Sequence, residues 1–196
     1  MMTKRLFAAV ALLVCLSGVA AMAVEEPSFK LVTRDGDFEL RDYPALVVAE
    51  AKLPGDRDAA AYAGFRLLAR YIFGGNARRQ SIAMTAPVVQ APADAASGGA
   101  GWTIRFTMPA GLSLDTLPKP DDPEVRLAAL PPARYAVVRF SGLAYRRDVE
   151  AQTARLEAFV RSRGLRIEGA PSLARYDPPW TLWFLRRNEV MIPIAR

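Results

Sequence analysis

An internal repeat constrains the fold of this chain more than any other feature of its sequence. The strand-like residues 44–49 are echoed by residues 133–139, and an offset of 89 to 90 residues also relates Leu67 to Leu156. Each copy is followed by a segment with helical periodicity and then by further strand-like segments. The repeat therefore predicts an α+β fold made of two strand-helix-strand halves that pack about a pseudo-twofold axis.

Two segments have the spacing and end signals of helices. The first begins near Asp56 or Asp58, either of which can cap free N–H groups, runs to about residue 73 and stops at the Gly-Gly-Asn of residues 74–76. The second runs from about residue 146 to 163, before Gly164. Its apolar stripe is that of an ordinary amphipathic helix, made of Val149, Thr153, Leu156, Phe159 and Val160.

Short alternating segments between turn residues predict antiparallel strands. An Asp-Gly-Asp turn at residues 35–37 predicts a hairpin between residues 29–33 and 38–40. Residues 91–101 predict a hairpin loop, and residues 112–123, with three prolines, predict a stiff connection. The other predicted strands cover residues 45–53, 81–90, 102–108, 124–130 and 134–140.

The first 23 residues have the composition of a secretory signal peptide. Lys4 and Arg5 precede an uncharged run, and Ala21-Met22-Ala23 supplies small residues for cleavage. We predict cleavage after Ala23, a single domain over residues 24–196, and a periplasmic location. The uncharged run reaches the lower limit for a membrane span, so a retained anchor is the alternative.

The composition excludes several classes of site. The chain contains no histidine, and its one cysteine, Cys15, lies in the predicted signal peptide. Residues 24–196 can therefore form neither disulfides, nor zinc sites built on Cys or His, nor a Ser-His-Asp triad. Loss of Lys4 and Arg5 lowers the formal net charge from +6 to +4. No basic run with interleaved aromatics indicates a nucleic-acid partner, and we expect a monomer.

The first predicted helix is apolar on more than one face. A core stripe is predicted for Phe65, Leu68 and Ile72. A neighbouring face carries further apolar or amphipathic residues and two arginines one turn apart: Tyr62, Arg66, Ala69, Arg70 and Phe73. Either the sheet and the C-terminal loop cover this face, or it forms a shallow groove for an aromatic ring system whose carboxylates pair with the arginines.

A second unusual stretch lies near the C-terminus. Asp177 precedes two prolines, which force an extended or turned backbone. Five of the next six residues, 180–185, are apolar or aromatic, and the polar run Arg-Arg-Asn-Glu follows. This combination suits a flat, apolar, anionic ligand, and it also suits a plain barrel strand that ends in a charged turn.

Two motifs together resemble those of the SOUL/haem-binding protein family. They are Ser-Ile-Ala-Met-Thr-Ala-Pro-Val at residues 81–88, and Tyr-Asp-Pro-Pro-Trp with Arg-Arg-Asn-Glu-Val at residues 176–190. The resemblance covers residues 29–194. It implies a distorted antiparallel β-barrel of two duplicated halves with two outer helices, resembling effector-binding domains. It also implies reversible, non-catalytic binding of haem or a related tetrapyrrole.

The resemblance places the binding groove between the first helix and the loop of residues 176–187. Arg70 falls on a basic site of the family's helix, and Arg66, one turn away, is added from helix geometry. Trp180 and Trp183 could stack on a porphyrin or fill the core. Tyr62, Ala69 and Phe73 complete the predicted cofactor-binding set, and no metal site is predicted.

The lack of histidine departs from the ligation used by some members of that family. We therefore expect haem to bind non-covalently, through apolar contact and propionate pairing, with weak or no axial ligation. Residues that could ligate iron in principle are Tyr62, Tyr71, Met84, Met108 and Met191.

Two other functions are considered for the sequence. One is a module that binds another flat amphiphilic molecule. The less favoured one is a hydrolase that uses Asp177 and Glu189 as acid and base. Against the hydrolase, Asp177 could cap the Pro-Pro turn while Glu189 pairs with Arg186 or Arg187.

Overall fold

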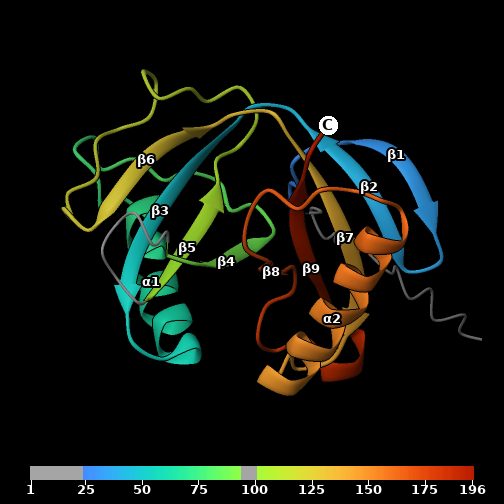
Figure 1. Ribbon diagram of the computed structural model, residues 1–196. Helices are drawn as coiled ribbons and strands as arrows, with labels where there is room; N and C mark the ends of the chain where they lie inside the picture. Colours follow the sequence, from blue (N-terminus) through green and yellow to red (C-terminus); the bar gives the residue numbers. More distant parts are fainter. Residues whose placement is uncertain (1–23, 94–100) are drawn as a thin grey trace, which may run out of the picture.

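One antiparallel sheet of nine strands and two helices form the described part of the protein (Figure 1). The computed structural model describes residues 24–93 and 101–196. In chain order its elements are β1 (Lys30–Asp35), β2 (Phe38–Tyr43), β3 (Leu46–Pro54), α1 (Arg57–Ile72), β4 (Val88–Pro92), β5 (Gly101–Thr107), β6 (Val125–Leu130), β7 (Ala133–Ser141), α2 (Arg146–Ser162), β8 (Ser172–Arg175), the 3-10 turn η2 (Trp183–Leu185) and β9 (Arg187–Ile194).

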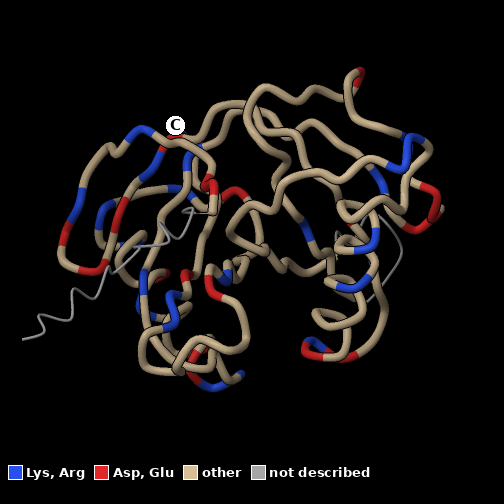
Figure 2. The backbone as a smooth tube through the Cα atoms, turned by 180° about the vertical axis from the view of Figure 1, so that it is seen from behind, with Lys and Arg blue, Asp and Glu red and all other residues tan. Residues whose placement is uncertain are grey.

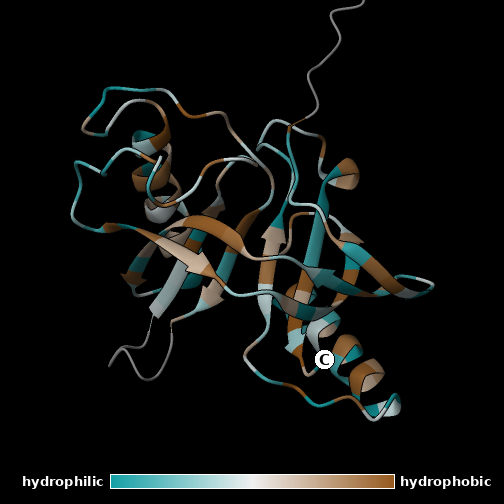
Figure 3. Cartoon of the chain, turned by 90° about the horizontal axis from the view of Figure 1, so that it is seen from above, coloured by the Kyte–Doolittle hydropathy of each residue, from teal (hydrophilic) through white to brown (hydrophobic). Residues whose placement is uncertain are grey.

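The strand order confirms the two duplicated halves. In the first half β3 pairs with β5 and β5 with β4, and in the second half β7 pairs with β9 and β9 with β8. On its other edge β3 pairs with β6, and β7 pairs in the same way with β2. The pair of β4 and β8 joins the two halves. Figures 1 and 3 show these halves side by side. The sheet runs from β1 at one edge to β6 at the other and is not closed into a barrel.

Each half buries one face of its strands against its own helix. Leu68 of α1 packs with Ala49 and Ile104, and in the second half Leu156 of α2 packs with Val138 and other residues of β7 and β9. Since side chains alternate across a strand, the intervening residues lie on the opposite, helix-free face. A third buried cluster forms there, containing Tyr43, Val137, Ala174 and Met191.

Helix α1 begins and ends where the sequence predicts. Asp56 Oδ1 accepts hydrogen bonds from the backbone N–H groups of Asp58 (2.8 Å) and Ala59 (3.3 Å), which are otherwise free at a helix start. The helix ends before Gly74, whose φ of +102° favours glycine. The predicted core stripe is wrong at Phe65, which is 40% exposed and only touches the edge of the core at Phe106.

The structure differs from the sequence-based prediction at the start of one strand. The strand predicted for residues 81–90 is wrong in its first part, because regular pairing begins only at Val88 and Ser81 and Thr85 form isolated bridges. The predicted signal peptide and most of the predicted hairpin loop at 91–101 lie outside the described residues. Over the described ranges, neither helix has the length and apolar character needed to cross a membrane.

A close approach between α1 and β5 requires glycine at position 64. A Cβ added to Gly64 would lie 2.4 Å from Cγ1 of Ile104 and 2.9 Å from Cδ1 of Leu53. We expect Gly64→Ala to lower the free energy of unfolding by about 1–3 kcal/mol through overpacking, although alanine is the better helix former. Urea denaturation measures this change.

The control is Ala63→Gly on the exposed side of the same turn, which should cost about 1 kcal/mol through helix propensity alone. A more stable Gly64→Ala protein would contradict the close packing of α1 on β5.

Candidate functional site

The outward face of α1 carries aromatic side chains that nothing in the described residues covers. Tyr62 is 67% exposed and Phe73 is 62% exposed. Arg66 and Arg70 are also exposed on this face, and Ala69 is half-buried between them. The interpretation that the sheet and the C-terminal loop bury this face is therefore wrong for its two largest aromatic residues.

The arginines of α1 stand along one edge of this face. Residues four apart lie one turn apart on a helix, so Tyr62, Arg66 and Arg70 form a row. The Arg66 guanidinium carbon lies 5.8 Å from the centre of the Tyr62 ring, within the range of a cation–π contact. Figure 2 shows basic positions along α1. This face thus combines aromatic area with donors suited to carboxylates.

The C-terminal loop presents a second exposed apolar surface. Trp180 is 81% exposed and Trp183 is 60% exposed, and the other large apolar residues exposed there are Leu182, Phe184 and Leu185. The prediction of a plain strand for this stretch is wrong, because only the η2 turn interrupts an irregular loop and β9 begins after it, at Arg187. The tryptophans are therefore not core residues.

Hydrogen bonds across its base hold this loop in shape. Asp177 Oδ2 accepts from the backbone N–H of Arg187 (2.6 Å), and Arg186 donates through Nε to the carbonyl of Thr181 (2.8 Å) and through a terminal nitrogen to the carbonyl of Pro179. These bonds fix the backbone, so that the apolar side chains project outward instead of folding back on the loop.

The two exposed surfaces belong to different halves of the molecule. Trp183 lines a surface hollow of about 370 Å³ together with Leu143 and Tyr145, which lie between β7 and α2, and with residues of both elements. The halves are linked at the start of both helices, where Arg146 pairs with Asp56 (3.2 Å) and Arg57 donates to the carbonyl of Ala144 (3.1 Å). Tyr62 lies on α1, in the first half, and Trp183 lies beside α2, in the second half.

A buried ion network lies beneath the root of the loop. Glu189, fully buried, accepts hydrogen bonds from Arg41 (2.8 and 3.1 Å), from Arg187 (3.0 Å) and from the hydroxyl of Tyr176 (2.8 Å). Arg187 also stacks on the Tyr176 ring at 3.6 Å and pairs with Glu26 at 3.0 Å. The network joins β2, β9 and the residues on both sides of the loop.

Charge pairing overrides the cost of burial in this network. Burial acts to raise the pKa of Glu189, but the hydrogen bond and charge of Arg41, followed by Arg187, bring it below the usual value. Burial acts to lower the pKa of Arg41, and its bonds to Glu189 raise it instead. Burial raises the pKa of Tyr176, and the charge of Glu189 adds to that rise. The carboxylate and both arginines therefore stay ionised.

This geometry opposes the acid–base pair considered for a hydrolase. Glu189 is inaccessible to solvent and its carboxylate is held between two arginines, so it is a poor proton donor. Asp177 accepts from a backbone N–H at the base of the loop, as a structural cap does. The expectation that Glu189 pairs with Arg187 is confirmed, and Arg41 is its second partner.

The candidate iron ligands are unequal in exposure. Tyr71, Met108 and Met191 are buried, and only Tyr62 and Met84 of that set are exposed. Among the described residues no cluster of acidic, His or Cys side chains could hold a metal ion.

Sequence reasoning missed several residues that complete these features. Leu143 and Tyr145, which lie beside the loop surface, were not singled out. Arg41 and its partner Glu39 were also missed. Arg41 stands between Leu40 and Asp42, so no local pattern marks it as buried, and its partner Glu189 lies 148 residues away.

The fold, with its two halves and an exposed aromatic and basic surface, is that of a duplicated α+β domain. Among solved structures it is similar to the C-terminal domain of EcmrR (TM-score 0.58, 12% identity, 81% of this chain and 97% of that one). It is also similar to a hydrolase from Listeria innocua (TM-score 0.56, 13% identity, 84% and 94%). At these identities the likeness concerns the fold alone.

The sequence comparisons define the family. The family model described as SOUL heme-binding protein matches residues 24–193. Heme-binding protein 2 of Homo sapiens is 29% identical over 185 residues, which cover 87% of this chain and 90% of that protein. The chain belongs to the SOUL heme-binding protein family.

We predict that Glu189→Gln strongly destabilises the protein. The substitution leaves the buried Arg41 and the neighbouring Arg187 without their shared carboxylate, and breaking a buried ion pair costs about 3–5 kcal/mol. Chemical denaturation should show a loss of about 3 kcal/mol or more. The control Glu157→Gln, which breaks an exposed pair with Arg161, should change stability by less than about 1 kcal/mol. Equal effects would show that the network contributes no more than a surface pair.

The same network predicts a dependence of stability on pH. The folded pKa of Glu189 is lowered, so its contribution is present above the pKa of an unfolded glutamate and disappears as pH falls through the folded value. The stability gap between the natural protein and Glu189→Gln should therefore be largest near neutral pH and narrow below about pH 4.5. Denaturation measured from pH 7 to pH 3 tests this, and a gap that widens in acid would contradict it.

Proposed function

We propose that the protein binds haem or a related tetrapyrrole, without catalysis, against the exposed face of α1 and the C-terminal loop. The observation that carries the proposal is the exposure of Tyr62 and Phe73 beside Arg66 and Arg70 on one helix face. The family membership and the name of the human relative support the same ligand class.

The physical basis is the match between this surface and a flat anionic ring system. Burial of apolar surface contributes about 25 cal/mol per Å², so a ligand that covers Tyr62, Phe73 and the loop tryptophans would gain much of its affinity there. Propionate groups would accept charge-assisted hydrogen bonds from Arg66 and Arg70, as guanidinium forks match carboxylates. Trp180 and Trp183 of the C-terminal loop would supply further aromatic surface for stacking.

We propose that any bound haem has weak or no axial ligation. Residues 24–196 contain neither histidine nor cysteine, and Tyr62 and Met84 are the exposed members of the remaining candidate set. A surface of this kind recognises the ring and its carboxylates, and it would release the ligand readily because no strong iron–protein bond has to break.

A second candidate function is the binding of another flat amphiphilic molecule at the same surface. The observation that favours it is the absence of a histidine ligand, since the aromatic and arginine contacts would serve any planar anion. In either case we propose that the chain acts as a monomer in the periplasm after loss of residues 1–23.

We expect haemin to bind the protein saturably at one equivalent, followed by absorbance and tryptophan quenching. The double variant Arg66→Ala/Arg70→Ala should bind about 5- to 150-fold more weakly, which corresponds to about 1–3 kcal/mol for lost charge-assisted hydrogen bonds. The matched control is Arg155→Ala/Arg161→Ala, which removes the same charge from the surface of α2 and should leave haemin affinity unchanged.

Three outcomes separate the alternatives. Equal haemin affinity in the two double variants would contradict the role of Arg66 and Arg70. The absence of saturable haemin binding, with binding of another planar anion, would favour the second candidate function. A sharp six-coordinate, low-spin haem spectrum would contradict weak axial ligation.

A further inference from the structure

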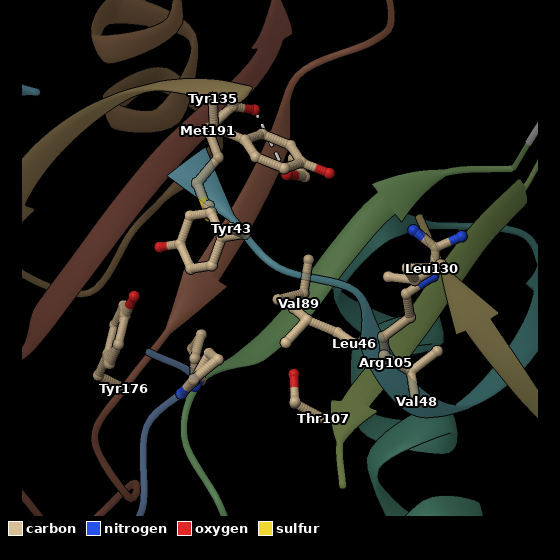
Figure 4. A pocket seen from close by; sticks show the side chains of 13 residues that line it. Tyr43, Leu46, Val48, Val89, Arg105, Thr107, Leu130, Tyr135, Tyr176 and Met191 are labelled. Atoms are coloured by element: carbon tan, nitrogen blue, oxygen red, sulfur yellow. Dashed lines mark hydrogen bonds between the residues drawn. The ribbon is translucent and has the colours of Figure 1, made fainter. Parts of the chain in front are cut away.

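The helix-free face of the sheet contains a pocket at the junction of the two halves. Its volume is about 80 Å³, and Figure 4 shows its lining side chains. None of the residues assigned above to the tetrapyrrole surface lines it. The residues that the argument uses are Val48, Val89 and Arg105 from the first half and Tyr43, Tyr135 and Met191 from the second.

The volume limits the size of any ligand. The pocket is small beside the roughly 300–1,000 Å³ of sites that take drug-sized ligands. A single ring suits this space, with its substituent directed toward the partly exposed guanidinium of Arg105. A tetrapyrrole, with four linked rings, is too large to enter, so this pocket and the α1 surface would take different ligands.

The pseudo-twofold axis relates residues on opposite walls of the pocket. With the repeat offset of 89 residues, Leu46 of β3 is equivalent to Tyr135 of β7, and both line the pocket. The same offset makes Glu50 equivalent to Arg139. Since Glu50 pairs with Arg105 and Arg139 pairs with Glu189, Arg105 is equivalent to Glu189. The duplication has therefore left different side chains at equivalent positions, a leucine in one half and a tyrosine in the other.

The polar end offers hydrogen-bond donors to an anion. Arg105 donates through Nε to Glu50 at 2.8 Å, which holds the guanidinium in place and uses one of its five N–H donors. Burial raises the pKa of Tyr135, and the charge of Arg105 opposes that rise, as expected for neighbouring groups. In Figure 4 the Tyr135 hydroxyl points toward the half that carries Arg105. The hydroxyls of Tyr43 and Tyr176 instead join the Glu189 network.

The apolar end offers a slot for a ring. Val48, Val89 and Met191 line it together with Leu46 and Leu130. The rings of Tyr43 and Tyr135 stand edge to face, with centres 5.7 Å apart, which is a favourable arrangement for a third aromatic ring beside them. Thioether sulfur also makes favourable contacts with aromatic rings.

We propose that this pocket binds a small aromatic monocarboxylate of about the size of benzoate. The carboxylate accepts hydrogen bonds from the terminal nitrogens of Arg105 and from the Tyr135 hydroxyl, and the ring lies against Val48, Val89 and Met191. The site does not depend on the tetrapyrrole surface, because it lies on the opposite face of the sheet from α1 and shares no residue with that surface.

Titration of the full chain with sodium benzoate tests the proposal. Calorimetry gives the affinity, and the NMR signal of the Met191 methyl group reports on the pocket, with the exposed Met84 as internal reference. We expect saturation at one equivalent with a shift of the Met191 signal and not of Met84. The absence of a saturable Met191 shift would overturn the proposal.

Two variants and a control test the polar end. Arg105→Gln should weaken benzoate binding at least about tenfold, and Tyr135→Phe about two- to tenfold. Arg126→Gln is the matched control, since Arg126 is exposed on β6 opposite Glu50 but does not line the pocket, and it should bind as the natural protein does. If Arg105→Gln does not fold, Tyr135→Phe decides the question alone. Equal affinity in Tyr135→Phe and Arg126→Gln would overturn the assignment.

Two ligand comparisons complete the test. Benzamide, which keeps the ring but lacks the charge, should bind at least about tenfold more weakly than benzoate, and equal affinity would overturn the carboxylate specificity. Haemin affinity should be the same for Arg105→Gln and the natural protein. Loss of haemin binding in Arg105→Gln would overturn the separation of the two sites.

Discussion

The buried pair of Arg41 and Glu189 is the interaction on which the arrangement of the C-terminal loop depends. It joins β2 to β9 on the helix-free face. Glu189 also holds Tyr176 and Arg187, the residues on either side of the C-terminal loop. A buried pair of this kind contributes little net stability compared with apolar packing, but breaking it is costly. Its role here is to fix one arrangement of the residues at the root of the loop, which carries the exposed tryptophans.

The duplication explains why the molecule has two kinds of surface. Each half forms its own hydrophobic core by packing its helix on its strands. The second helix follows an ordinary amphipathic pattern, whereas α1 keeps aromatic residues on its outward face. The helix-free faces of the two halves meet at the β4–β8 pair. In the pocket beside that pair, the equivalent positions of the two halves carry different side chains, such as Leu46 and Tyr135.

Much of the fold could be predicted from local signals. Asp56 marks the start of α1 and Gly74 its end, and the alternation of short segments indicates antiparallel strands. The failures have clear physical causes. Residues 81–87 have strand-like composition but pair only through isolated bridges, and the stretch after Pro179 was open between a strand and a loop because both can be rich in aromatics. Phe65 has core spacing yet lies at the edge of α1's contact with the sheet.

The sequence alone determined the α+β class, the duplication, the two helices and the chemistry excluded by the lack of histidine, because these depend on periodicity, capping and composition. It also singled out Tyr62, Arg66, Arg70 and Phe73 as an unusual helix face. Only the tertiary structure decided that this face is exposed, that Glu189 is buried between Arg41 and Arg187, and that Arg105 and Tyr135 share a pocket. Those facts depend on contacts between strands far apart in the chain, and no local pattern records which distant residue a strand will face.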